Sequence, residues 1–133
     1  MLQLSIFLEN AKGRLAQVLN TLSELGVNIK ALSLADTKDY GVLRIIVDHP
    51  EKVAAQLKER NFVVKLTPVW VLEVSDQPGG LAQVLNKLVD EGVIVEYMYA
   101  FLEKETGLVQ VVMRVREEEI MIKAVEKYGF SKM

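Results

Sequence analysis

The sequence predicts an α+β fold made of two tandem β-α-β-β-α-β units, each an antiparallel sheet with its helices on one face. Three observations predict this fold. One segment occurs twice in the chain, some short segments alternate apolar and polar residues, and others place apolar residues at helical spacing. The repeated segment is "NAKGRLAQVL" at 10–19 and "DQPGGLAQVL" at 76–85. We therefore treat the chain as a duplicated domain, with predicted domains at 1–67 and 68–133.

The repeat extends well beyond this segment. The register that aligns Gly13 with Gly79 also places Gly26 on Gly92 and aligns Gly41 with Gly107. Near the end, Phe62 meets Phe130 only if the second copy has gained two residues.

The elements of the first copy follow in order. "LQLSIFL" at 2–8 alternates apolar residues with period two and predicts a strand. A turn and an amphipathic helix follow, and the helix is expected to stop at Gly26. Segments 27–35 and 40–48 predict two strands joined by the turn "DTKD". A second helix is expected from Pro50, where the missing N–H is tolerated, and the strand "FVVKL" at 62–66 closes the unit.

The second copy predicts the same elements. After the strand "VWVLEV" at 69–74, a helix ends at Gly92. Two strands at 93–102 and 106–115 flank the turn "EKE", a helix begins near Glu117, and the chain given ends at "FSKM". This element order is the ferredoxin-like split arrangement.

Composition excludes several classes of function. The 133 residues are 50% hydrophobic, carry a net charge of −2 and include no cysteine. Charges of both signs are interspersed, so nucleic acid and anionic membranes are not expected partners. No apolar run approaches the roughly 18 residues of a membrane span, and a basic leader is missing at the N-terminus, so a cytoplasmic location is expected. We expect no disulfide, no metal site and no cofactor.

Catalytic and RNA-binding sites are not predicted either. An RNA-binding sheet would need stacking aromatics where Val42, Arg44 and Ile46 stand. The runs "EKE" at 103–105 and "EEE" at 117–119 are explained by a turn and by the dipole of a helix start. His49 precedes Pro50 and is interpreted as a residue of the capping region. We therefore predict that the chain is not an enzyme.

The repeated turn is the remaining candidate site. In "DQPGGL" the proline fixes one backbone angle and the glycines permit positive φ, so amides of the first helical turn are expected to point into the loop. Such a loop can hold a carboxylate without Lys or Arg. Glycine and proline also occur at tight strand-to-helix turns for purely geometric reasons, and that alternative stays open.

Both copies resemble the opening of an ACT domain, the amino-acid-sensing module. Its first turn runs acidic residue, two others, Gly, one other and Leu, with a further Gly about a dozen residues later and a strand that begins Asn-Ile. The resemblance covers essentially the whole chain, once per half. It implies a regulatory protein that binds a free amino acid between paired ACT domains and regulates either a partner enzyme, such as one of amino-acid metabolism, or a transcription or metabolic pathway.

The resemblance also implies the site residues. In the first copy they are Asn10, Lys12, Gly13, Arg14, Leu15 and Asn28, and in the second they are Asp76, Pro78, Gly79, Gly80 and Leu81. The second loop matches the motif more closely, whereas the position of Asn28 is Ile94 in that copy. The preferred hypothesis is one pocket that pairs the 76–81 loop with Asn28. Asn28 could instead simply open a strand. Leu32, Met98 and Phe101 favour an apolar or aromatic ligand if they line the pocket, but strand residues of this kind are more often part of a core. Ligands with a hydroxyl or acidic side chain stay open.

Geometry favours a homodimer. With a strand order of 4-1-3-2, pairing two copies through their second strands leaves a gap of roughly 29 Å between the fourth strand of one and the first strand of the other. Thr67 and Pro68 span only on the order of 10 Å. Either the second strands pair between two chains, or "FVVKL" exchanges into another sheet.

The alternative function is a structural or interaction subunit that has lost its ligand.

Overall fold

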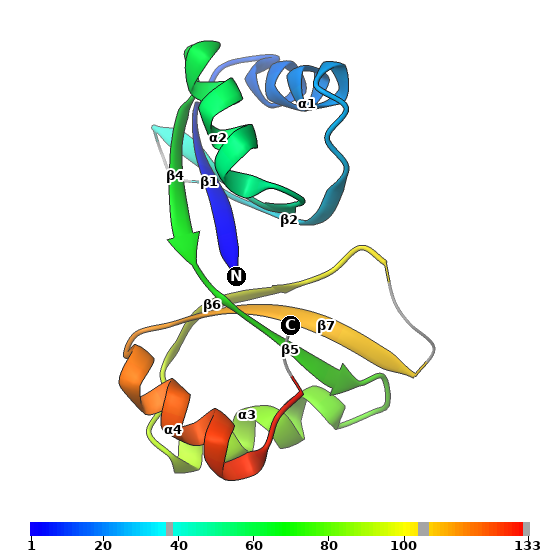
Figure 1. The fold of residues 1–133 in the computed structure, drawn as a ribbon, viewed down its shortest axis with the longest axis vertical. Helices are drawn as coiled ribbons and strands as arrows, with labels where there is room; N and C mark the ends of the chain where they lie inside the picture. Colours follow the sequence, from blue (N-terminus) through cyan, green and yellow to red (C-terminus); the bar gives the residue numbers. More distant parts are fainter. Residues whose placement is uncertain (37–38, 104–106, 132–133) are drawn as a thin grey trace. The chain divides into compact units, whose positions relative to one another are not determined.

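The computed structural model describes residues 1–36, 39–103 and 107–131, which form two compact units. The first unit, domain 1, comprises Leu2–Pro68, and the second, domain 2, comprises Met1 and the chain from Val69 onward. Each domain is an antiparallel sheet whose two helices cover one face (Figure 1). The predicted α+β class with two β-α-β-β-α-β units is confirmed, except that the described residues of domain 2 include no sixth element. The central residues of the predicted turns "DTKD" and "EKE" lie outside the described residues, as do 132–133.

Domain 1 contains all six predicted elements. They are β1 (Leu2–Glu9), α1 (Arg14–Glu24), β2 (Ile29–Asp36), β3 (Tyr40–Val47), α2 (Pro50–Glu59) and β4 (Val63–Pro68). The sheet order is β2-β3-β1-β4, as predicted. Leu4 and Ile6 of the central strand β1 are fully buried beneath the helices, in a core that also contains Leu57 of α2. Because β4 pairs with β1 of its own sheet, the structure does not adopt the strand exchange considered above.

Domain 2 repeats this arrangement with one strand fewer. Its elements are β5 (Trp70–Ser75), α3 (Gly80–Asp90), β6 (Val95–Ala100), β7 (Leu108–Val115) and α4 (Glu118–Tyr128). The sheet order is β5-β7-β6. At the place of a fourth strand, the amide of Glu73 donates to the carbonyl of Ser131 over 3.0 Å. Leu72, Leu88 and Met113 form the centre of its core.

Strand register places the extra residues of the second copy in the hairpin between β6 and β7. Leu4 of β1 pairs with Ile45, and its counterpart Trp70 pairs with Met113. By the same register, Gly41 corresponds to Val109, because they pair with equivalent residues of β1 and β5. The alignment of Gly41 with Gly107 is therefore wrong. The physical reason is that an exposed hairpin loop accepts an insertion without disturbing the ladder, whereas the strand does not.

The predicted helix stops are confirmed. Gly92 follows α3 with φ +85°, a left-handed conformation that costs glycine little. The next amide, of Val93, donates back to the carbonyl of Leu88 over 3.0 Å, which satisfies a terminal carbonyl of the helix. Gly26 follows α1 in the same conformation, with φ +71°.

Glu91 links the two helices of domain 2. It lies at the C-terminal end of α3 and accepts hydrogen bonds from Lys127 and from the Tyr128 hydroxyl of α4. The hydrogen bond from Lys127 is the main reason that the pKa of Glu91 lies below its usual value of 4.5. The contribution of this contact to stability is therefore present above pH 4.5 and is lost as the pH falls through the lower folded-state pKa.

The substitution Lys127→Met is expected to raise the pKa of Glu91, since it removes the ammonium that favours the ionised carboxylate. A carboxyl NMR titration of Glu91 in both proteins measures this change. Lys123→Met on the same helix is the control, because Lys123 takes no part in the pKa shift of Glu91. An unchanged Glu91 titration in the Lys127 variant would show that the contact is not formed in solution.

Candidate functional site

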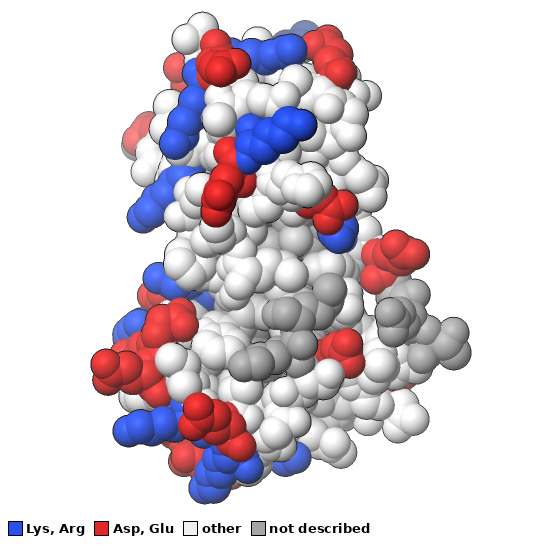
Figure 2. Space-filling model, viewed as in Figure 1, with Lys and Arg blue, Asp and Glu red and all other residues white. Residues whose placement is uncertain are grey.

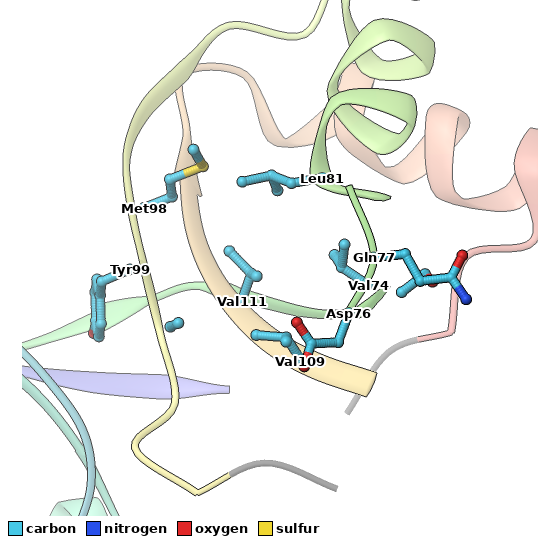
Figure 3. Close-up of a pocket in the computed structure, with 10 residues that line it drawn as sticks. Val74, Asp76, Gln77, Leu81, Met98, Tyr99, Val109 and Val111 are labelled. Carbon is cyan, nitrogen blue, oxygen red and sulfur yellow. The ribbon is translucent and has the colours of Figure 1, made fainter. Parts of the chain in front are cut away.

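Domain 2 contains a hollow of about 330 Å³ beside the loop between β5 and α3 (Figure 3). We call it the domain 2 hollow. Its apolar lining residues are Val74, Leu81, Met98, Ala100, Val109 and Val111. In Figure 3, Leu81 and Met98 face each other across the space, and Val111 lies between them at its floor. Most of the surface that the hollow offers is therefore hydrocarbon.

The sheet creates this hollow through its pleat. Val74 of β5 pairs with Val109 of β7, and Val111 pairs with Ala100 of the edge strand β6. Alternate residues of a strand share one face, so Val109 and Val111 both point toward the helices. Val111 is 6% exposed at the floor. By contrast, Met98 is 40% exposed, so the hollow opens along β6.

The loop at the end of the hollow is a compact turn. Gly79 caps α3 with φ +84°, and the amide of Gly80 donates to the carbonyl of Gln77 over 2.9 Å. The first bond within the helix runs from the amide of Gln83 to the carbonyl of Gly79. The Gly80 amide is therefore used inside the turn, which corrects the expectation that it points to a ligand. The amides that precede the first intrahelical bond and remain for a ligand are those of Leu81 and Ala82.

Gly80 has a second role that the sequence did not reveal. A Cβ atom at this position would lie 2.1 Å from the carbonyl oxygen of Ser75, at the end of β5. Only glycine allows α3 to start this close to the preceding strand. Domain 1 has Arg14 at the corresponding position, so its helix starts without this constraint.

Asp76 supplies the charge of the site. Its amide donates to the carbonyl of Gly107 over 3.0 Å, which anchors the loop to the hairpin. Its carboxylate lies beside Val109 at one end of the hollow, whereas the amide group of Gln77 points away from it (Figure 3). Pro78 lies exposed at the tip of the loop. The hollow therefore has an acidic group and a helix N-terminus at the same end.

The predicted site residues of domain 1 form a different environment. Gly13 caps α1 with φ +81°, and Leu15 packs against the core. The guanidinium of Arg14 lies 4.5 Å from the ring centre of Phe62 and donates to Gln17, so it extends along the helix surface. The backbone amide of Arg14 donates a hydrogen bond to the carbonyl of Ala11 over 3.2 Å. Asn10 and Lys12 are exposed.

Asn28 lies in a separate polar hollow of domain 1, about 270 Å³ in volume. Asp48, His49 and Lys52 also line it. The hydrogen bond that Lys30 donates, over 2.8 Å, lowers the pKa of Asp48 below its usual value. His49 is the N-cap residue of α2, as interpreted from the sequence. Because Asn28 and the 76–81 loop belong to different domains, their pairing in one pocket stays a prediction.

Sequence reasoning found the loop and missed much of the hollow. Ala100, Val109 and Val111 were not among the predicted site residues. The available signal was the alternation of β6 and β7, which puts these residues on the helix-facing side next to the loop.

Other kinds of site find no support in the described residues. Within 1–36, 39–103 and 107–131, His, Asp and Glu form no group of three or more that could hold a metal ion. None of the helices described there is long and apolar enough to cross a membrane. Figure 2 shows basic and acidic side chains interspersed over the visible face of each domain, rather than one basic tract.

The comparisons with known proteins agree with this architecture. Among solved structures, the chain is similar to protein BT0572 from Bacteroides thetaiotaomicron, with 37% identity, a TM-score of 0.91, and coverage of 99% of this chain and 90% of that chain. The ligand-free regulatory subunit of aspartate kinase from Thermus thermophilus shares the fold at 14% identity, with a TM-score of 0.67 and coverage of 95% and 91%.

The corresponding subunit from Thermus flavus also shares the fold, at 15% identity, with a TM-score of 0.60 and coverage of 95% and 90%. A search of curated proteins finds no match. The family model of the ACT domain pair matches residues 1–128. The chain therefore belongs to the ACT domain pair family, as its two loops predicted.

Proposed function

We propose that this protein is a non-catalytic sensor of a free amino acid, which binds in the domain 2 hollow. The observation that carries the proposal is the combination of an apolar hollow with the carboxylate of Asp76 and the N-terminus of α3 at one end. Small-molecule sites are typically apolar cavities of about 300–1,000 Å³ with a few placed polar groups. The hollow agrees with that description.

A zwitterion matches the charges at this end of the hollow. Asp76 offers an acceptor to an α-ammonium group, and a charge-assisted hydrogen bond is about twice as strong as a neutral one. The amides of Leu81 and Ala82 offer donors to an α-carboxylate, which the helix dipole also favours. The ligand's side chain is then directed toward Val109 and Val111.

Family membership supports a regulatory role. ACT domain pairs are typical amino-acid-binding regulatory domains, and the two aspartate kinase subunits with this fold are described as regulatory. We therefore propose that the partner is an enzyme of amino-acid metabolism and that the protein acts in the cytoplasm. The ligand would change the partner's activity by binding one of its conformational states more tightly than the other.

We also propose a homodimer. β2 and β6 are edge strands of their sheets, and an edge strand offers unpaired backbone groups to a second chain. Such a dimer could bring Asn28 of one chain to the 76–81 loop of another. Light scattering of the purified chain measures this: a monomeric mass at micromolar concentration, with and without ligand, would contradict it.

The substitution Asp76→Asn is expected to weaken amino-acid binding about tenfold or more, because a charge-assisted hydrogen bond contributes about 1.5–3 kcal/mol. Calorimetric titration with each of the twenty amino acids identifies the ligand and measures its affinity. Asp90→Asn, at the exposed C-terminal end of α3 and outside the hollow, is the matched control and should leave affinity unchanged. Asn28→Ala in the same titration tests the cross-domain pairing.

The outcomes separate the two functions. Saturable binding of one or a few amino acids, weakened in Asp76→Asn, supports the sensor. If none of the twenty binds, the sensor is wrong and the protein is an interaction subunit that has kept the fold without the ligand.

A further inference from the structure

We infer that the ligand is a free amino acid with a large apolar side chain, and that Ala100 determines the size of side chain that domain 2 accepts. This inference rests on the proposed function and extends it to a class of ligand. It follows from a comparison of the two domains at structurally equivalent positions. It also implies that each chain has one such site, in domain 2.

Strand register defines the equivalent positions. Leu34 of β2 pairs with Leu43 of β3, and Ala100 of β6 pairs with Val111 of β7. Leu34 therefore corresponds to Ala100, and Leu43 corresponds to Val111. Where domain 1 has leucine, domain 2 has a smaller side chain at both positions.

On the other side of the hollow, domain 2 has one smaller and one larger side chain than domain 1. Leu8 of β1 pairs with Gly41, whereas its counterpart Val74 of β5 pairs with Val109. A Cβ atom added to Gly41 would lie 3.5 Å from a terminal methyl carbon of Leu34. In domain 1, therefore, the Leu34 side chain lies over this glycine and fills the space next to it.

Domain 2 reverses that arrangement. Ala100 has only a methyl group where Leu34 has an isobutyl group, so nothing from position 100 extends over Val109. The remaining space is part of the hollow of about 330 Å³ that Ala100, Val109 and Val111 line. A ligand's side chain can then occupy part of the volume that Leu34 occupies in domain 1, next to Val109.

The chemistry of the walls selects the ligand class. Beyond the loop, the side chains that line the hollow along β7 are valines, and Leu81 and Met98 flank them. A polar ligand side chain placed there would lose its hydration without gaining hydrogen bonds from these residues. An acidic ligand would also meet the carboxylate of Asp76. An apolar side chain gains from burial, at about 25 cal/mol per Å² of surface removed from water.

The test compares ligands and variants by calorimetry. L-leucine is expected to bind wild-type protein at least about tenfold more tightly than L-alanine, the smaller ligand. Ala100→Leu is expected to weaken leucine binding at least about tenfold, because the new side chain occupies the same space. Leu34→Ala in domain 1 is the matched control and should leave leucine affinity unchanged.

Folding of the variant is checked separately. Position 100 is exposed on an edge strand, and domain 1 carries leucine at the equivalent place with 50% exposure, so Ala100→Leu is expected to fold. Ala100→Val gives a second, smaller substitution, and its loss of leucine affinity should be intermediate. Circular dichroism confirms that each variant has the wild-type secondary structure.

Each possible result of these titrations supports or overturns the inference. Leucine, isoleucine, methionine or phenylalanine as the tightest ligand, with weaker binding in Ala100→Leu, supports the inference. Tightest binding of aspartate, serine or lysine overturns the inference and leaves the proposed function standing. Wild-type leucine affinity in a folded Ala100→Leu variant overturns the role of Ala100. If no amino acid binds the wild-type protein, both the inference and the proposed function fail.

Discussion

Replacing Gly80 with alanine is expected to destabilise domain 2 by about 3 kcal/mol or more, at the upper end of the cost of overpacking. The new methyl carbon would start 2.1 Å from the carbonyl oxygen of Ser75, which is backbone and cannot rotate away. Alanine favours a helix over glycine by about 1 kcal/mol, so the clash exceeds the gain. Either β5 or the start of α3 must shift, and amino-acid binding should be lost as well.

Urea unfolding followed by the fluorescence of Trp70 measures this effect, because the single tryptophan lies in domain 2. Arg14→Ala, at the equivalent position of domain 1, is the matched control. It loses the contact of the guanidinium with Phe62 and an exposed hydrogen bond to Gln17, and we expect a cost of about 1 kcal/mol or less at this exposed site. If Gly80→Ala unfolds at the wild-type urea concentration, the close approach to Ser75 is not present in solution.

Leu72→Ala is expected to reduce the stability of domain 2 by about 2–5 kcal/mol. Leu72 is fully buried on the helix-facing side of β5, in the same core cluster as Leu88 and Met113. Removing its branched side chain loses the burial energy and leaves a cavity that the surrounding strands cannot close. Such a loss is a large part of the stability of a small domain.

The same tryptophan-detected urea titration measures this loss. Val89→Ala on α3 removes apolar carbon from a side chain that is 67% exposed, and we expect its effect to stay within about 0.5 kcal/mol. Similar unfolding midpoints for the Leu72 and Val89 variants would contradict the assignment of Leu72 to the core.

The fold was predictable because its signals are local. The alternation in "LQLSIFL" predicted β1, and the position of Gly92 predicted the end of α3. The repeat then fixed the element order of both domains. The position of the two extra residues was not predictable, because Gly41 and Gly107 look equivalent in sequence and only the strand register distinguishes them.

The site was predictable in part. The motif located the loop at Asp76, but a motif does not show that the carbonyl of Gln77 already uses the amide of Gly80. The motif also does not show that the close approach of α3 to Ser75 requires glycine at position 80. The hollow depends on residues from β5, β6 and β7 and from the start of α3, which only the folded sheet brings together. Whether a hollow forms depends on the volumes of the side chains that meet there after folding. The periodicity of apolar residues in the sequence does not reveal these volumes.

We propose that domain 2 binds an amino acid between its loop and its hollow. The most direct measurement is an NMR titration of the wild-type protein with L-leucine, observing backbone amides and valine, leucine and methionine methyl groups. Binding at this site should produce saturable shifts at the amides of Leu81 and Ala82 and at the methyl groups of Val109, Val111 and Met98. Shifts that avoid these groups, or no shifts at millimolar leucine, would contradict it.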